Sequence, residues 1–243
     1  GNGNIIVEND GLLSAEIAIS TLNAPGPSEI RQLGGHIQGD IILSAGGYVD
    51  TFIIFDGLTE GDTFGDGDDL VEFRSGVDGP TPVYRGNIDG VASISVFPGS
   101  AYFDGNVANT AALNIFDQGR LIVSSEDAPN GPSQINVGTF NQSSMGTLAF
   151  EVSPNANSAG QIMTTGDANL GGTLEVVPLA GISGDMTEAH DVIVDGGSRN
   201  GACDTVWDTA LLDLTADYEV DDTVDLILER IAFDAPDGLT RNQ

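Results

Sequence analysis

The chain has 243 residues, of which 37 are Asp or Glu and only 7 are Lys or Arg, so its formal net charge at neutral pH is −30. Nucleic-acid affinity depends on cationic side chains, and anionic membrane surfaces repel a negative protein, so this charge excludes a nucleic-acid-binding protein and direct membrane insertion. The single cysteine, Cys203, excludes an internal disulfide framework and a zinc site built from cysteines.

Apolar residues make up 40% of the chain, which is enough for a hydrophobic core, and 33 Gly with 10 Pro indicate many turns. No apolar run reaches the roughly 18 residues that a membrane helix needs. The first residues, 1–4, lack the basic-then-apolar layout of a signal peptide, so we expect a mature or excised segment.

Five short segments in the middle of the chain alternate apolar with polar or small residues. Such alternation predicts strands with one buried and one solvated face. In chain order they are 93–96 (SISV), 113–116 (LNIF), 134–137 (QINV), 147–152 (TLAFEV) and 173–177 (TLEVV).

The strands recur with an elastic period of roughly 19 to 26 residues. The spacing is shortest from Ile94 to Leu113, longer from Leu113 to Ile135, and longest from Leu148 to Leu174. Glycine- and proline-rich turns separate the strands, and no long helical periodicity interrupts them. This pattern predicts an all-β, right-handed parallel β-helix, a solenoid in which each coil stacks on the last. An antiparallel β-sandwich, which also alternates strands with turns, is the alternative.

A β-helix has two ends whose strand edges carry unpaired donors and acceptors, and these must be capped, covered or paired. The predicted partner is therefore a second copy in homotypic end-to-end stacking, because lateral packing of rods with a charge of −30 is opposed by repulsion.

From Gly146 onward the sequence resembles the passenger domains of autotransporters, secreted proteins of Gram-negative bacteria. The matching segments are 146–152 (GTLAFEV), 166–176 (GDANLGGTLEV), 191–197 (DVIVDGG), 204–206 (DTV) and 224–228 (VDLIL), and 230–243 resembles the boundary before a linker helix and membrane barrel. The resemblance divides the chain into β-helix coils over 1–145 and, over 146–243, C-terminal coils similar to the region that nucleates folding.

The resemblance implies an extracellular or cell-surface location, outside a Gram-negative outer membrane. It implies a structural function, with the parent protein's outer-membrane barrel as a partner during secretion. The resemblance also implies that the last coils fold first. Self-association or adhesion to an unidentified host or cell-surface ligand is a separate expectation, which follows from the open coil ends.

One acidic turn is a candidate metal site. Residues 65–71 (GDGDDLV) overlap the glycine-rich nonapeptide that binds calcium in tandem repeats, and the candidate ligands are Asp62, Asp66, Asp68 and Asp69. The chain carries one copy of this pattern, so a solvated acidic turn is the competing interpretation, as it is for the acidic residues between 213 and 225. No other cofactor is expected.

Enzymatic activity is not expected, but a polysaccharide lyase or hydrolase is the alternative, because paired carboxylates among the acidic residues are a route to acid–base catalysis. The candidate cations in the repeat region are Arg31, Arg74, Arg85 and Arg120, and none lies in a recognisable motif. The histidines His36 and His190 are far apart in sequence, and no serine-nucleophile elbow is present.

Overall fold

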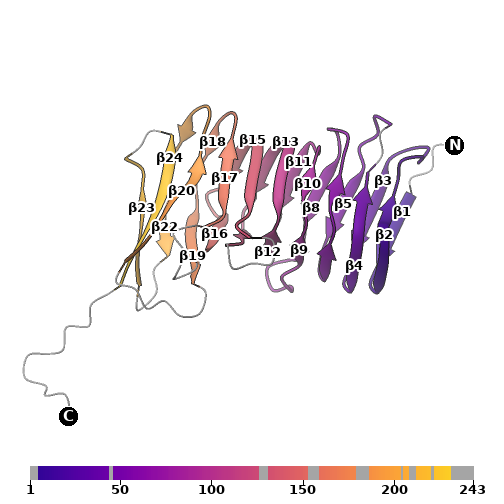
Figure 1. Ribbon diagram of the computed structural model, residues 1–243, viewed down its shortest axis with the longest axis horizontal. Helices are drawn as coiled ribbons and strands as arrows, with labels where there is room; N and C mark the ends of the chain where they lie inside the picture. The colour runs from indigo at the N-terminus through magenta and orange to yellow at the C-terminus, as the bar shows by residue number, and fades with distance from the viewer. Residues whose placement is uncertain are drawn as a thin grey trace, which may run out of the picture.

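The structure is a computed structural model, and it describes residues 5–43, 46–125, 131–152, 159–178, 186–203, 205–207, 212–219 and 222–230. The strands in these residues form a continuous sheet that is wound into a rod, with the N-terminal coil at one end and the C-terminal strands at the other (Figure 1). Neighbouring coils pair in parallel, so the predicted right-handed parallel β-helix is confirmed and the antiparallel sandwich is wrong. No helix long and apolar enough to cross a membrane occurs in these ranges.

Three parallel ladders run along the rod and give it three faces, here named A, B and C. Face A consists of β1 (Ile5–Asn9), β3 (Ser28–Gln32), β5 (Thr51–Ile54), β8 (Leu70–Phe73), β11 (Ser93–Val96), the ends of β13 (Asn106–Ile115) and β15 (Gln134–Gln142), β18 (Ala168–Asn169) and β21 (Arg199–Asn200). Face B consists of the starts of β2 (Leu12–Ser20) and β4 (His36–Ile42), then β6 (Leu58–Glu60), β9 (Val83–Arg85), β12 (Gly99–Asp104), β14 (Gly119–Val123), β16 (Thr147–Val152), β19 (Thr173–Pro178) and β22 (Thr205–Trp207). Face C consists of the ends of β2 and β4, β7 (Thr63–Phe64), β10 (Ile88–Asp89), the starts of β13 and β15, β17 (Gln161–Thr164) and β20 (Met186–Val194).

The register on each face stacks like residues. On face A, Phe52 lies opposite Val71, which lies opposite Ile94, which in turn lies opposite Leu113. The coils differ in length, because bonded residues of successive coils are 19 positions apart at Asp50 and Asp69 but 31 apart at Asn169 and Asn200. The strand register is nevertheless maintained from coil to coil, and the ladders continue past residue 146 without a break.

One sequence-based pairing is wrong. The spacing suggested that Leu113 stacks on Ile135, whereas Leu113 pairs with Phe140 on face A and Ile135 pairs with Val107 on face C. The reason is that β13 and β15 each bend around a corner and contribute to two faces. Alternation predicts which side chains point inward, but it does not distinguish the faces.

The core is a column of inward side chains that runs the length of the rod. Phe52, Phe140 and Phe150 are fully buried, and the ring of Tyr84 stacks on that of Phe103 at 5.6 Å between centroids. Burial of apolar area at about 25 cal/mol per Å² is the main stabilising contribution. Each coil buries its inward face only because another coil lies on it, so the stability of a coil depends on its neighbours.

At the corner between faces B and C the chain turns through a column of glycines, in which each glycine lies against a backbone carbonyl of the coil before it. The column contains Gly39, Gly61, Gly86 and Gly105. A methyl group on Gly61 would lie 2.3 Å from the carbonyl oxygen of Gly39, so this corner leaves no room for a side chain.

The two ends of the rod differ. At the C-terminal end, β24 (Thr223–Arg230) pairs antiparallel with β20, and β23 (Leu212–Asp217) pairs antiparallel with β24. The segment 224–228, which the resemblance places among the last parallel rungs, is therefore an antiparallel cap. Leu226 of this cap is fully buried. At the N-terminal end, β1 and β2 pair with β3 and β4, and no described strand covers their other edge.

Candidate functional site

The predicted acidic turn lies between β7 and β8, at the corner between faces C and A. Its most buried member is Asp69, whose Oδ1 accepts a hydrogen bond from the N–H of Asp50 at 2.9 Å and whose Oδ2 accepts one from the N–H of Asp66 at 3.1 Å. Burial raises the pKa of the Asp69 carboxyl to about 6, and nearby Asp66 and Asp50 add to the shift. Asp69 thus joins its own turn to the preceding coil.

The preceding coil repeats this arrangement. Asp50 is fully buried, its Oδ1 accepts the N–H of Ser28 at 2.6 Å, and its Oδ2 accepts the hydroxyl of Thr21 at 2.6 Å. Two successive coils are therefore joined to their predecessors by a carboxylate that accepts a backbone N–H.

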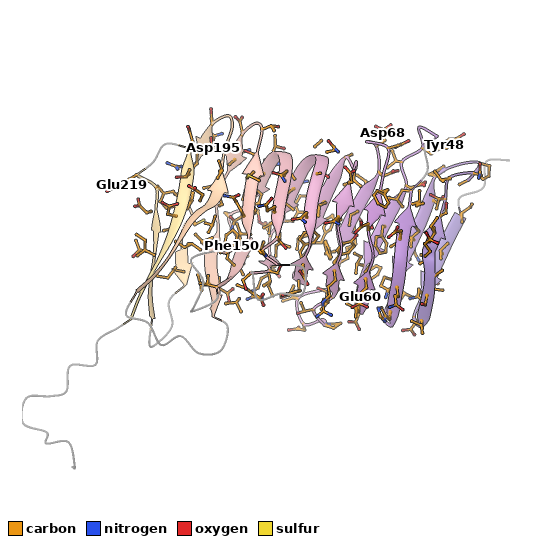
Figure 2. The ribbon with its side chains drawn as sticks, viewed as in Figure 1. Tyr48, Glu60, Asp68, Phe150, Asp195 and Glu219 are labelled. Atoms are coloured by element: carbon orange, nitrogen blue, oxygen red, sulfur yellow. The ribbon has the colours of Figure 1, made fainter. Side chains whose placement is uncertain are left out.

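The structure separates the four predicted calcium ligands. Asp66 and Asp69 meet in one turn, and Oδ1 of Asp66 accepts the N–H of Asp68 at 3.4 Å. Asp62 lies at the corner between faces B and C, where its Oδ1 accepts the backbone N–H of Asn87 at 2.7 Å and the side-chain amide of Asn87 at 3.1 Å. In Figure 2, Asp68 and Glu60 lie on opposite sides of the rod.

Within the described ranges, no three His, Cys, Asp or Glu side chains are grouped so that they could hold a metal ion by themselves. Of the four predicted ligands, Asp62, Asp66 and Asp69 accept backbone N–H groups, as residues that stabilise turns do. Calcium binding by the four aspartates stays a prediction.

A strip of charged side chains crosses four coils on face B. Nε2 of His36 lies 2.9 Å from Oε2 of Glu60, and Nη1 of Arg85 lies 3.5 Å from Oε1 of Glu60. On its other side, Nε of Arg85 lies 3.7 Å from Oδ2 of the fully buried Asp104. We call these four residues the face-B strip. They place a cation between two carboxylates, with an imidazole beside one of them.

The face-B strip continues toward a phenol and a second carboxylate. Tyr102, on the same strand as Asp104, donates its hydroxyl to Oε2 of Glu151 at 2.9 Å. Burial raises the pKa of Tyr102, and the hydrogen bond to Glu151 and the nearby Asp104 carboxylate raise it further. The phenol therefore stays protonated and acts as a hydrogen-bond donor.

The other predicted cations are also paired. Arg31 contacts Glu8 and Glu29, and Arg74 binds Glu72 while its guanidinium lies 3.9 Å from the ring centroid of Phe97. Both bonds between Arg120 and the carboxylate of Glu175 are 2.8 Å long, which is a bidentate pair. Arg85 differs because it bridges two carboxylates that come from coils on either side of it.

Sequence reasoning missed the partners of Asp104. The hydroxyls of Ser124 and Ser133 are both buried and lie 2.8 Å apart, and Ser124 donates to Asp104 at 3.4 Å. The N–H of Gly105 donates to Ser133 at 3.0 Å. These serines come from the next coil and its loop, so only the coil register could have brought them to Asp104.

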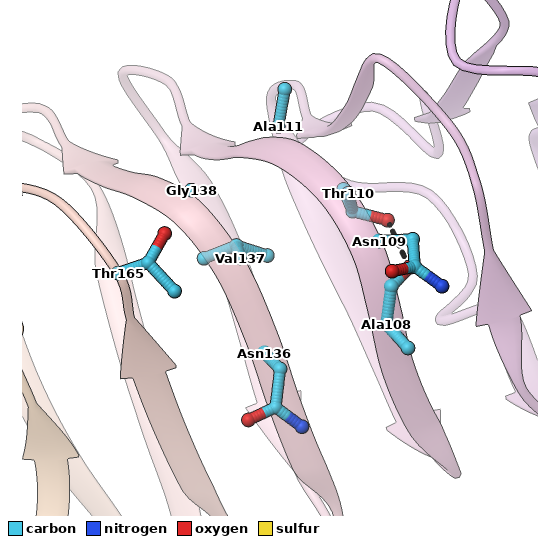
Figure 3. Close-up of a pocket in the computed structure, with 8 residues that line it drawn as sticks. All are labelled: Ala108, Asn109, Thr110, Ala111, Asn136, Val137, Gly138 and Thr165. Carbon is cyan, nitrogen blue, oxygen red and sulfur yellow. Dashed lines mark hydrogen bonds between the residues drawn. The ribbon is translucent and has the colours of Figure 1, made fainter.

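A shallow groove of about 550 Å³ lies at the corner between faces C and A, where β13 and β15 bend (Figure 3). It is lined by Ala108, Asn109, Thr110, Ala111, Asn136, Val137, Gly138 and Thr165. The lining contains no charged side chain, although the molecule as a whole is strongly acidic. Asn109 has a left-handed backbone, with φ of 49°, and donates to Asp89 at 2.7 Å.

The remaining candidates have plain structural surroundings or lie outside the described side chains. Cys203 is half-buried against the core, and its N–H donates to the hydroxyl of Tyr218 at 3.2 Å. The side chains of His190 and Asp213, and the whole of Asp221, lie outside what the structure describes.

No protein-family model matches the chain, and no curated protein matches it.

Proposed function

We propose that this chain is a rigid, secreted or surface-exposed structural segment of the autotransporter passenger type, whose C-terminal cap folds first and whose remaining coils add toward the N-terminus. The observation that carries the proposal is the difference between the two ends of the rod. An antiparallel pair of strands closes one end, whereas at the other no described strand pairs with the outer edges of β1 and β2.

The cap has the properties of a folding template. Strands β23 and β24 are separated by few residues, so their pairing closes a short loop and needs little loss of chain entropy. Leu226 and Val224 are fully buried and Leu214 nearly so, which anchors the pair to the last parallel coil. Each later coil then gains backbone partners and apolar contacts on a surface that already exists.

The N-terminal coil has the properties of an open, adhesive edge. Three of its apolar side chains are largely exposed: Ile6 at 56%, Leu12 at 68% and Ile17 at 49%. An unpaired strand edge flanked by exposed apolar side chains takes a further strand, either from another coil or from another molecule. This supports self-association or adhesion at that end.

The order of folding is tested on the full chain with two matched substitutions. Leu226→Ala in the cap and Leu43→Ala in the second coil both remove a buried leucine, and each costs about 2–5 kcal/mol. If the cap folds first, Leu226→Ala mainly slows refolding, whereas Leu43→Ala mainly speeds unfolding.

Stopped-flow refolding and unfolding in urea measure both rates. Pulsed hydrogen exchange during refolding should also protect β20 and β24 before β1 and β2. Equal effects of the two variants on the refolding rate, or earlier protection of β1 and β2, would reject the proposed order.

A polysaccharide-active enzyme is the second candidate, and the face-B strip is the observation that favours it. Arg85 lies between Glu60 and Asp104 on an outer face, where a chain of sugars could lie along the coils. The test is incubation with acidic and neutral polysaccharides, with Arg85→Gln as the matched variant. New reducing or unsaturated sugar ends that depend on Arg85 would support catalysis. If neither protein produces such ends, polysaccharide cleavage is excluded as a function.

A further inference from the structure

A ladder of asparagine side chains runs along the outside of face A toward the cap end of the rod. Its members are Asn114 on β13, Asn141 on β15, Asn169 on β18 and Asn200 on β21. The amide of Asn141 donates to Oδ1 of Asn114 at 2.9 Å, and the amide of Asn169 donates to Oδ1 of Asn141 at 2.7 Å. Asn200 extends the ladder by donating to Asn169 at 3.0 Å. An amide has two N–H donors and two lone pairs on its oxygen, so each amide keeps hydrogen-bonding capacity beyond the ladder.

The part of face A formed by β11, β13 and β15 carries only uncharged side chains on its outer side. The six outward residues alternate with the inward core residues of these strands, and they are Ser93, Ser95, Ala112, Asn114, Thr139 and Asn141. We call these six residues the neutral surface. The coils on either side differ, because Glu72 lies beside Ser95 in the coil before and Asp167 precedes β18 in the coil after.

The groove at the corner between faces C and A continues the neutral surface (Figure 3). Ala111 and Gly138 line this groove and directly precede the first neutral-surface residues of β13 and β15. The groove encloses about 550 Å³, and its polar lining side chains are amides and hydroxyls. Neither β13 nor β15 contains a charged residue along its whole length. A ligand seated in the groove can therefore extend across face A without meeting a charge on these two strands.

An exposed aromatic ring borders the neutral surface at the corner between faces A and B. Phe116 directly follows β13, is 42% exposed and stacks on Phe97 of the preceding coil at 4.9 Å between ring centroids. The guanidinium of Arg74, from the coil before that, lies 3.9 Å from the ring centroid of Phe97. In the coil after Phe116 the corresponding position belongs to Ser143, whose N–H donates to the carbonyl of Ile115. A serine is too small to cover a phenyl ring, so Phe116 stays accessible on this side.

We infer that the groove, the neutral surface and Phe116 together bind an uncharged oligosaccharide chain. A sugar ring has hydroxyl groups at its edge, which suit the amides of Asn114 and Asn141 and the hydroxyl of Thr139. It also has an apolar face of C–H groups, which suits the ring of Phe116. The stretch from the groove to Phe116 covers about six residues of extended chain, or about 20 Å, which accommodates more than one sugar ring.

The charge of the molecule decides which class of oligosaccharide fits. A protein with a net charge of −30 repels acidic polysaccharides, whereas a neutral chain is not repelled. The inference names a ligand class for the proposed adhesive function but places it on face A, away from the open N-terminal edge. It does not depend on the order of folding or on the face-B strip.

The test uses the full chain and soluble hexasaccharides as probes. Uncharged glucan, mannan and galactan hexasaccharides form one set, and the polygalacturonate hexamer, which carries a carboxylate on each sugar, is the charged counterpart. Isothermal titration calorimetry in about 150 mM NaCl, near physiological ionic strength, measures each Kd. The wild type should bind at least one uncharged hexasaccharide and should bind the charged hexamer at least about tenfold more weakly.

Two variants with matched controls locate the site. Phe116→Ala should raise the Kd about 3- to 10-fold, as expected for the loss of one aromatic contact. Phe64→Ala removes a ring of similar exposure, 38%, on face C and should leave the Kd unchanged. Asn141→Asp replaces donors by a carboxylate in the neutral surface and should raise the Kd about tenfold or more. Asn200→Asp makes the same change in charge at the far end of the same ladder and should leave the Kd unchanged.

Far-UV circular dichroism and urea unfolding establish that each variant is folded. If Asn141→Asp does not fold, Thr139→Glu takes its place, because Thr139 points outward from the neutral surface and is no member of the ladder. The longer, charged side chain should cover the neutral surface and abolish binding.

Several outcomes would overturn the inference. They are no binding of any uncharged hexasaccharide, equal or tighter binding of the charged hexamer, and an unchanged Kd in both Phe116→Ala and Asn141→Asp. Weakening by Phe64→Ala or Asn200→Asp as large as in the paired variant would also reject the location. Loss of binding in Arg85→Gln would move the site to the face-B strip. The refolding rates test the order of folding separately, so either idea can fail without the other.

Discussion

Replacement of one corner glycine by alanine should destabilise the rod far more than the small size of a methyl group suggests. Gly61 lies in the glycine column between faces B and C, with φ of 149°, a conformation that side-chain-bearing residues rarely adopt. The added Cβ would lie 2.3 Å from the carbonyl oxygen of Gly39 in the preceding coil. That is about 1 Å closer than van der Waals contact allows.

The magnitude follows from two separable contributions. An unfavourable backbone conformation costs about 1–3 kcal/mol, and forcing an extra carbon against neighbouring atoms costs about 1–3 kcal/mol more. The neighbouring atom belongs to a backbone within the stacked coils, so it does not move aside easily. We therefore expect Gly61→Ala to lower the free energy of unfolding by about 3–5 kcal/mol.

Two other glycines separate these contributions. Gly67 has φ of 104°, but a methyl group there would meet nothing within 4 Å, so Gly67→Ala should cost only the backbone part, about 1–2 kcal/mol. Gly11 has neither a positive φ nor a close neighbour, so Gly11→Ala should change stability by less than about 0.5 kcal/mol.

Urea unfolding followed by far-UV circular dichroism gives the three free energies. Hydrogen exchange then localises the damage, because in a solenoid the coils on either side of Gly61 should lose protection first. Equal costs for Gly61→Ala and Gly67→Ala would refute the argument from close approach. A cost for Gly11→Ala as large as either would refute the argument from geometry altogether.

Three further predictions concern single polar contacts. Folding raises the pKa of Asp69 from 3.8 to about 6. The contribution of Asp69 to the free energy of unfolding is therefore complete below pH 3.8 and is lost as the pH rises through 6. Urea unfolding at several pH values should show this loss in the wild type and a flatter pH dependence in Asp69→Asn. Tyr84→Phe removes the hydroxyl that donates a hydrogen bond to Thr63 at 2.7 Å inside the core. The substitution should lower the free energy of unfolding in urea by about 1–2 kcal/mol. An unchanged free energy of unfolding would contradict a buried hydrogen bond at this position. The pair of Arg120 with Glu175 is largely buried. A double-mutant cycle with Arg120→Met and Glu175→Gln should therefore give a coupling energy above about 1 kcal/mol. A coupling energy near zero would mean that the pair behaves as an ordinary surface ion pair.

Much of the strand content could be predicted from sequence because alternation is a local signal. The segments 93–96 and 147–152 coincide with β11 and β16, and the anchors Ile94 with Leu113 and Leu148 with Leu174 are true neighbours. The cap could not be predicted in the same way. Residues 223–230 alternate apolar with polar residues as a parallel strand does, although they pair antiparallel. Parallel and antiparallel strands show the same alternation, so alternation does not predict the direction of pairing.

The polar sites depended on register, which local pattern does not provide. Asp69 was a candidate because of its acidic turn, but its partner Asp50 belongs to the preceding coil. His36 and Glu60 are distant in sequence and meet only because β4 and β6 are neighbours on face B.

Coils of different length keep the same inward register, so the ladders tolerate additional residues between their paired positions. The length of the rod and the character of its surface can thus change independently: adding or deleting a whole coil changes the reach, and lengthening a corner changes what the surface presents. A short peptide inserted at such a corner would be displayed at a defined height along the rod, with an unchanged scaffold beneath it.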